Sequence, residues 1–516
     1  MKSEQQAVPI AAASLALACA AHPVGPTRLE GARWPSELPP ATAENVRHAL
    51  ARFSYGPTPD AAAEVRRLGI ARWFDAQLDA PTDTLPSGPY GSALGEPDDV
   101  IAAFGVRHDT DPVDTEQISL RKEARRVNVK ALLAHVSAAQ VQRHVESDAQ
   151  LHALLVDFWS NHFSVFARKN ALKVLAGNYV QSTIVPHALG RFEDLLIATA
   201  RSPAMLVYLD NDKSVAAKPG GRRGLNENYA RELLELHTLG VDGGYSQADV
   251  IDVARILTGW GLGDPKQQGL SFEFSASRHD FGEKTVLGQH FPAGAGEEEG
   301  LRLLRFLARH EATARHIARK LCQRFIIDEP SDELIRPVAE AFLSTQGDLP
   351  STLRSLLRLP GFWARSVRGA KLKKPSEFLA SALRALGLTL DGTARIAKVS
   401  EQLGEPALLY PAPTGYPDRA VAWAGSSQIL ARMDVATRLV AGTLPGVSPG
   451  HWDTLLPSAG SREKLVECIN ERLFGGLADA QTLRILHEEA ERAHSPEDAR
   501  DTALALALGS PAFQRR

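Results

Sequence analysis

Apolar residues recur at the spacing of a helix over most of this chain, from Glu116 to the C-terminus. Between Leu225 and Leu236, for example, they lie at i, i+4, i+8 and i+11, which places them on one face of a helix. A shorter helical pattern covers residues 59–68, with Pro59 at its first position. The dominant pattern along the chain is therefore helical.

Signals for strands are few. Leu270–Phe274 and Lys284–Leu287 have the alternation of short strands and predict one small hairpin. Ser246 and Ser495 each precede an acidic residue by three positions, which is typical of a helix start. We therefore predict an all-α fold, a large multi-helix globular body with at most a small β-hairpin.

The chain of 516 residues is long enough to bury a large core. Prolines spread through residues 20–40 prevent a helix there, and residues 80–116 have the composition of a loop region. We predict that residues 1–40 form an export signal or arm followed by a proline-rich linker. Residues 41–516 are predicted to form a single large helical domain, or two packed subdomains with a boundary near residues 365–375.

The N-terminal segment has features of a secretory signal. Lys2 precedes a weakly apolar stretch from Ala7 to Ala18, and the small residues before Cys19 are typical of a cleavage site or a weak lipid-anchor motif. Glu4 and Pro9 argue against a signal and favour an N-terminal arm. We predict a periplasmic or secreted protein, with a lipid anchor at Cys19 as an option, and a cytoplasmic one if the segment is not a signal.

Composition excludes several classes of function. Lys and Arg number 58 against 61 Asp and Glu, so no overall field favours nucleic-acid binding. No run of eighteen apolar residues exists, so no membrane span is predicted. The three cysteines have no metal-binding spacing and are too few for a disulfide scaffold, although a pairing of Cys322 with Cys468 stays open.

Three segments together resemble a known family. They are Phe158–Phe163, Leu225–Gly240 and Leu257–Trp260. They resemble the large bacterial family called domain of unknown function 1800, over most of the chain. This resemblance implies an exported protein with a protein partner encoded nearby, and it implies no particular activity. Members of that family usually carry Gly-Trp-Pro where this chain has Gly415-Tyr416-Pro417, which puts any role of that tryptophan in doubt here.

Two carboxylates in the second of these segments are candidates for acid–base chemistry. On a helical wheel Glu232 lies at the edge of the apolar face that contains Tyr229, and Glu235 comes next. A buried carboxylate must be paired, hydrogen-bonded or bound to a metal. The alternative to a catalytic role is an internal ion pair with Arg231, Arg255 or Lys320.

Two histidine positions suggest a metal. His162 follows an apolar helical stripe and is predicted to face the interior, while His279 and Asp280 lie in a polar loop. Together with Glu232 these side chains would suit a divalent transition metal such as zinc, iron or manganese. The alternative for His162 is an ordinary core histidine. His237 is expected on the opposite flank from Glu232 and is interpreted as structural.

The remaining polar candidates are binding residues. Asn226, Asn228 and Arg231 would orient the acidic groups or hold a substrate. Arg222 and Arg223, in a glycine-rich loop before a helix, could bind an anion, or the loop could simply be mobile and basic.

His310 and His316 are interpreted as marking a helix start and an exposed turn. The sequence hypothesis is a metal-dependent hydrolytic or oxidative enzyme acting outside the cytoplasm, with Glu232, Glu235 and Asp280 as catalytic groups. The rival is a non-enzymatic binding or assembly protein that works with its genetic neighbour. A binder of an anionic glycan or lipid headgroup is a third hypothesis.

Overall fold

The structure is a computed structural model. It describes residues 38–81, 90–104, 115–216, 224–263, 270–450, 452, 456 and 461–516, with only the backbone for 115–123. The predicted signal, the anchor at Cys19 and the loop arginines Arg222 and Arg223 lie outside the described residues.

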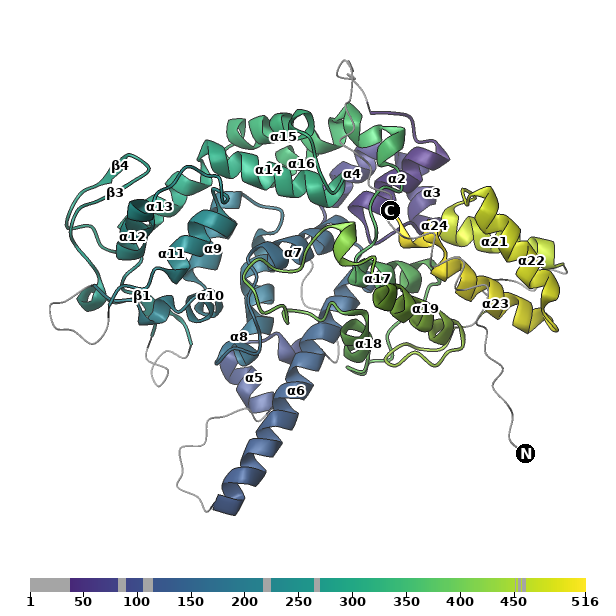
Figure 1. The fold of residues 1–516 in the computed structure, drawn as a ribbon, viewed down its shortest axis with the longest axis horizontal. Coiled ribbons are helices and arrows are strands. Elements are labelled where there is room, and N and C mark those ends of the chain that lie inside the picture. The colour runs from purple at the N-terminus through teal and green to yellow at the C-terminus, as the bar shows by residue number, and fades with distance from the viewer. Residues whose placement is uncertain are drawn as a thin grey trace.

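Helices make up most of the described chain, as predicted (Figure 1). The first three are α2 (Ala43–Phe53), α3 (Pro59–Leu68) and α4 (Ile70–Leu78). The Thr42 and Thr58 hydroxyls accept hydrogen bonds from backbone amides in the first turns of α2 and α3, and Pro59 occupies the first position of α3. These caps explain where both helices begin.

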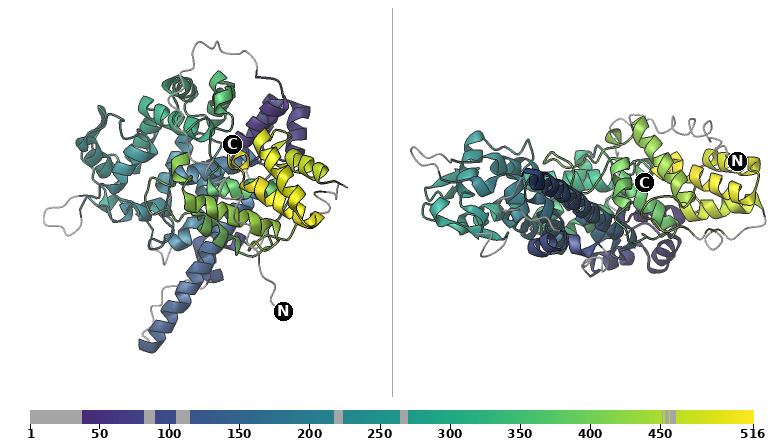
Figure 2. Two further views of the ribbon diagram at one scale, coloured as in Figure 1. Left: turned by 45° about the vertical axis from the view of Figure 1, so that its right-hand side comes forward. Right: turned by 90° about the horizontal axis from the view of Figure 1, so that it is seen from below.

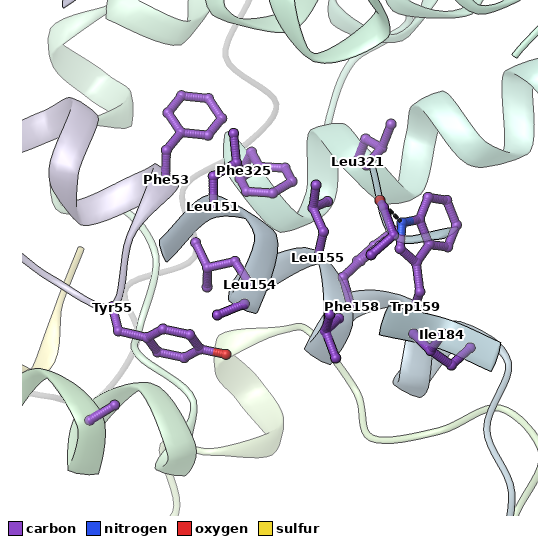
Figure 3. Packing of buried hydrophobic residues seen from close by; sticks show 14 of the residues in the cluster. Phe53, Tyr55, Leu151, Leu154, Leu155, Phe158, Trp159, Ile184, Leu321 and Phe325 are labelled. Carbon is purple, nitrogen blue, oxygen red and sulfur yellow. Dashed lines mark hydrogen bonds between the residues drawn. The ribbon is translucent and has the colours of Figure 1, made fainter. Parts of the chain in front are cut away.

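The centre of the molecule is the buried helix α7 (Gln150–His162). Around it lie α5 (Pro97–Phe104), the 32-residue α6 (Thr115–Glu146), α8 (Leu172–Asn178) and a π-helical turn, η2 (Tyr179–Ile184). Figure 3 shows side chains of α7 packed near Phe53 of α2, Tyr55 shortly after it, and Leu321 and Phe325. The far end of α6 projects from the body (Figure 2).

A lobe at one end contains α9 (Phe192–Arg201), α10 (Pro203–Tyr208), α11 (Asn228–Glu232), the π-helical turn η5 (Leu233–His237), α12 (Gln247–Ile256) and α13 (Glu297–Ala308). It also holds four short strands, β1 (Trp260–Leu262), β2 (Phe272–Phe274), β3 (Lys284–Val286) and β4 (Gln289–Phe291).

The strand pairing differs from the predicted hairpin. β2 pairs with β1, with Gly261 opposite Glu273, and β3 pairs with β4, with Thr285 opposite His290. The prediction that residues 270–274 pair with 284–287 is wrong. Leu287 and Gly288 between β3 and β4 both have positive φ, which makes a two-residue turn and folds β4 straight back onto β3.

From α14 (Glu311–Phe325) onward, the described residues form helices and the segments that connect them. The helices that follow α14 are α15 (Asp332–Ser344), α16 (Leu349–Arg358), α17 (Pro375–Ala385), α18 (Ile396–Leu403), α19 (Ser426–Val440), α21 (Arg462–Phe474), α22 (Ala480–Arg492), α23 (Pro496–Gly509) and α24 (Pro511–Gln514). Short 3₁₀ turns are η1 (Gly91–Ala93), η3 (Val185–His187), η4 (Asn211–Lys213), η6 (Ala276–Arg278), η7 (Pro360–Trp363), η8 (Arg365–Val367) and η9 (Ala420–Ala422).

The C-terminus returns to the first helices. Leu372 and Arg515 form an isolated antiparallel bridge, and Lys371 and Arg516 exchange two backbone hydrogen bonds. Figure 1 shows this end beside α2, α17 and α21. Residues of α2, residues 368–385 and the C-terminal segment therefore meet in one place. Within the described part of the chain, no helix is both long and apolar enough to span a membrane.

Candidate functional site

The helix that carries Glu232 and Glu235 is not continuous. After α11 the chain widens into η5, so His237 is buried while Leu236, expected on the apolar face, is only half-buried. Glu232 is half-buried, and its pKa is raised by loss of solvation and by the neighbouring Glu235 carboxylate. Glu235 is also half-buried and accepts a 3.5 Å hydrogen bond from Tyr245.

The cations expected to neutralise Glu232 have other partners. Arg231 pairs with Glu227 at 3.3 Å, and Arg255 pairs with Asp252 at 2.7 Å and with Asp280 at 2.9 Å. The two glutamates thus lie at the edge of the core, facing partly to solvent.

His162 is buried, as predicted, in an aromatic environment. Its ring packs edge-on to Trp159 and Phe163, and its Nε2 lies 3.1 Å from the carbonyl oxygen of His237. The rings of His237 and His316 lie 6.2 and 6.1 Å away. Burial, followed by the charge of Lys320, holds the pKa of His162 well below its usual value, so the imidazole is neutral.

Two expectations about the other histidines are settled by this packing. His310 does cap the start of α14, because its Nδ1 accepts a hydrogen bond from the Ala312 amide at 3.1 Å. His316 is not in an exposed turn. It lies inside α14, largely buried, with Nε2 3.2 Å from the Leu236 carbonyl oxygen.

His279 and Asp280 belong to a separate network of paired charges. The His279 ring lies between the carbonyl oxygens of Thr258, at 2.7 Å, and Ala295, at 3.1 Å, and 3.4 Å from the Glu299 carboxylate. Glu299 in turn accepts a 2.7 Å hydrogen bond from Lys284. These contacts fix the connection between β2 and β3.

Asp280 is held from two sides. Its carboxylate accepts hydrogen bonds from the Arg255 guanidinium at 2.9 Å and from the Gly282 backbone amide at 2.9 Å. Burial alone would raise its pKa, but these hydrogen bonds outweigh that effect and lower it. The side chain is ionised and has little capacity left for a ligand.

Asn226 and Asn228 tie the start of α11 to the turn after α10. The Asn226 amide donates to the Asp210 carbonyl at 3.0 Å, and the Asn228 amide donates to the Leu209 carbonyl at 3.2 Å. Asp210 is left-handed, with φ of 59°. These amides therefore stabilise an unusual turn.

The structure does not bring the predicted metal ligands together. His162 lies in the aromatic core, Glu232 at the edge of α11, and His279 with Asp280 in the Arg255 network. In the described ranges, no three His, Cys, Asp or Glu side chains are arranged to hold a metal ion. The metal centre stays a prediction without structural support. Cys322 and Cys468 are both free thiols here.

A different place has the form of a binding site. A cavity of about 370 Å³ lies where residues 44–57, 368–385 and 473–516 meet. Arg47 and His48 come from α2, Ser381 from α17 and Phe513 from α24, and Lys373 and Arg516 lie on the paired segments between them. We call it the terminal cavity.

Lys373 is the central residue of the terminal cavity. It is 6 % exposed, its Nζ donates a 3.0 Å hydrogen bond to the Ser381 hydroxyl, and the same nitrogen lies 3.7 Å from the Phe513 ring centroid. Within the described chain no carboxylate oxygen is within 4.0 Å of it. Burial, and then the charge of Arg47, lowers the pKa of Lys373 well below its usual value.

The two neighbouring lysines differ in this respect. Lys371 donates to Asp328 at 2.6 Å, and Lys374 donates to Glu405 at 2.7 Å and to Asp157 at 3.2 Å. These carboxylates raise the pKa of Lys374 despite its burial. Of the three, Lys373 alone faces the cavity.

Arginines form the rest of the polar wall. Arg516 pairs with Glu377 at 3.1 Å, but its Nε and Nη1 are buried without a hydrogen-bond partner among the described residues. Arg47 donates to the Leu477 carbonyl at 3.0 Å. The acids that line the cavity, Glu44 and Asp479, are exposed at its rim.

The rim acids are also already engaged. Glu44 pairs with Arg368, and Asp479 caps α22 by accepting from the Thr482 amide at 2.8 Å. The interior of the terminal cavity is therefore lined by the basic side chains Arg47, Lys373 and Arg516, and its acids lie at the rim. Such an interior can accept an anion.

Sequence reasoning missed this site for a specific reason. Lys371, Lys373 and Lys374 fall within four residues, a charge run that normally marks a solvated surface. The one available signal was Pro375, which starts a helix directly after the run.

Comparison with known proteins gives one match. A family model described as "Protein of unknown function (DUF1800)" matches residues 48–515. A search of curated proteins found no match. A search of solved structures found none either.

Proposed function

We propose that this chain, which belongs to the DUF1800 family of proteins of unknown function, binds a small carboxylate in the terminal cavity. The observation that carries this proposal is the buried Lys373 amine, which lines the cavity without a carboxylate partner among the described residues. Buried cationic groups are ordinarily paired. A ligand carboxylate would supply the missing partner.

The arginine wall supports the same ligand. Arg47 and Arg516 line the cavity, and their guanidinium N–H groups are suitable donors to a carboxylate. A planar carboxylate matches the geometry of a guanidinium and can accept two such hydrogen bonds. The cavity volume of about 370 Å³ lies within the range of small-molecule sites.

The test is a binding screen on the full chain. Small mono- and dicarboxylates are titrated by calorimetry against wild type, Lys373→Met and the control Lys398→Met, an exposed lysine on α18 outside the cavity. We expect saturable binding to wild type and the control, and a loss of about tenfold or more in Lys373→Met, equal to about 1.4 kcal/mol. Absence of carboxylate binding, or equal binding by Lys373→Met, would contradict the proposal.

A further inference from the structure

We infer that Lys373 is a nucleophile that forms an imine with a bound carboxylate carrying an aldehyde or ketone group, such as a 2-oxo acid. This inference rests on the proposed function, because the carboxylate, bound by the cavity arginines Arg47 and Arg516, places the carbonyl carbon beside the amine. It adds a reaction to what is otherwise a binding site.

The geometry leaves the amine available. Lys373 Nζ is held by the Ser381 hydroxyl at 3.0 Å and lies over the Phe513 ring, and both of these side chains line the terminal cavity. Ser381 directs its own proton to the Phe378 carbonyl at 3.1 Å, so its oxygen is the acceptor toward Lys373. The nitrogen lone pair is therefore not used by Ser381.

The surroundings also favour the unprotonated form of the amine. A lysine becomes nucleophilic when it is desolvated or adjacent to other cations, since both effects favour the neutral form. Lys373 has both: it is buried, and Arg47, Arg432 and Arg516 are the cations whose charges lower its pKa. Glu377 acts in the opposite direction, but that carboxylate is already paired with Arg324 and Arg516.

The reaction is balanced without an oxidant or reductant. The Lys373 nitrogen attacks the carbonyl carbon, a C–N bond forms, the C=O π bond breaks, and a proton moves from nitrogen to that oxygen. The resulting carbinolamine then loses water as its C–O bond breaks and the C=N bond forms. One amine and one carbonyl compound give one imine and one water.

The experiment traps the imine in the full-length protein. Wild type is incubated with pyruvate or glyoxylate and sodium cyanoborohydride, and peptide fragmentation locates the reduced adduct. We expect one adduct per chain on Lys373, with Lys371 and Lys374 unmodified because carboxylates hold their amines. Lys373→Arg should give no adduct while retaining the fold by circular dichroism.

Lactate is the matched control, because it has the carboxylate and lacks the carbonyl. Lactate that binds and slows labelling of Lys373 by pyruvate supports the inference. Labelling spread evenly over exposed lysines overturns the inference. Binding of lactate and pyruvate without any adduct also overturns it, but leaves the binding proposal intact. If neither compound binds at all, both proposals fail.

Discussion

Buried charges in this protein fall into two groups at the scale of single residues. Glu299 is fully buried and is matched by Lys284 at 2.7 Å and His279 at 3.4 Å. Lys373 is buried beside a hydroxyl and an aromatic ring. The paired charges around Glu299 stabilise a loop. A buried amine without a carboxylate partner, such as that of Lys373, destabilises the folded state and indicates a binding site.

The first prediction concerns the Glu299 network. Glu299→Leu should lower the free energy of unfolding by about 3 kcal/mol, because it leaves Lys284 buried without its partner. The double variant Lys284→Met/Glu299→Leu should recover much of that loss. Urea denaturation followed by circular dichroism measures both. Equal destabilisation by the single and double variants would show that the charges are not coupled.

The second prediction concerns Gly415, in the Gly-Tyr-Pro segment. Its φ is +68°, and an added Cβ would lie 2.3 Å from the Asn161 carbonyl oxygen. Asn161 also clamps this segment, donating to the Tyr416 carbonyl at 2.8 Å and accepting from its amide at 2.7 Å. This close contact joins the Phe158–Phe163 segment to the Gly415-Tyr416-Pro417 segment.

Gly415→Ala should therefore destabilise the protein by about 3 kcal/mol, from backbone strain and from the clash together. Gly404→Ala is the matched control, with φ of +90° and open space around the added Cβ. It should cost only about 1 kcal/mol, which is the strain alone. Thermal unfolding measures the loss of stability in each variant. Similar losses in the two variants would show that the Cβ clash at Gly415 does not contribute.

At the scale of elements, helix starts are the best-predicted features. Ser246 begins α12 with a complete capping box, in which its hydroxyl and the Asp249 carboxylate each accept from a backbone amide. Ser246→Ala should cost about 1 kcal/mol of stability. Ser427→Ala, at an exposed position inside α19, is the control and should change stability little. Equal effects in chemical denaturation would contradict a capping role.

The elements that the sequence mispredicted share a physical cause. A periodic pattern assumes a constant 3.6 residues per turn, but η5 is wider, so the buried position moves from Leu236 to His237. Strand pairing was wrong because a local turn at Leu287 and Gly288 decided it. Neither a widened turn nor a turn conformation appears in a pattern of apolar residues.

At the scale of the whole molecule, several histidines are buried in neutral form. Burial lowers the pKa of His48 and His237 to about 3 and of His144 and His316 to about 4. In the unfolded chain these groups bind protons near pH 6.5. Acid therefore favours the unfolded state, and stability present at neutral pH is lost as the pH falls below about 6.5.

We expect the free energy of unfolding to drop steeply between pH 6.5 and pH 4, with His237 alone accounting for roughly 3 kcal/mol by pH 4. His237→Asn should have a flatter profile over this range, whatever its stability at neutral pH. His290→Gln, at an exposed position, should keep the wild-type slope. Denaturant titrations at each pH give the slope of the free energy of unfolding against pH. A flat wild-type profile would refute the claim that buried neutral histidines cause the loss of stability in acid.

The sequence by itself determined the helical class, the helix starts marked by Pro59, Ser246 and Ser495, the inward position of His162 and the family, because these depend on local spacing and on long motifs. Tertiary structure decided which polar groups meet. It separated Glu232 from His279 and placed Lys373 beside Ser381 and Phe513. Burial and pairing depend on residues that can lie hundreds of positions apart in the sequence. A run of charges that predicts an exposed surface, such as Lys371 to Lys374, can therefore line a cavity.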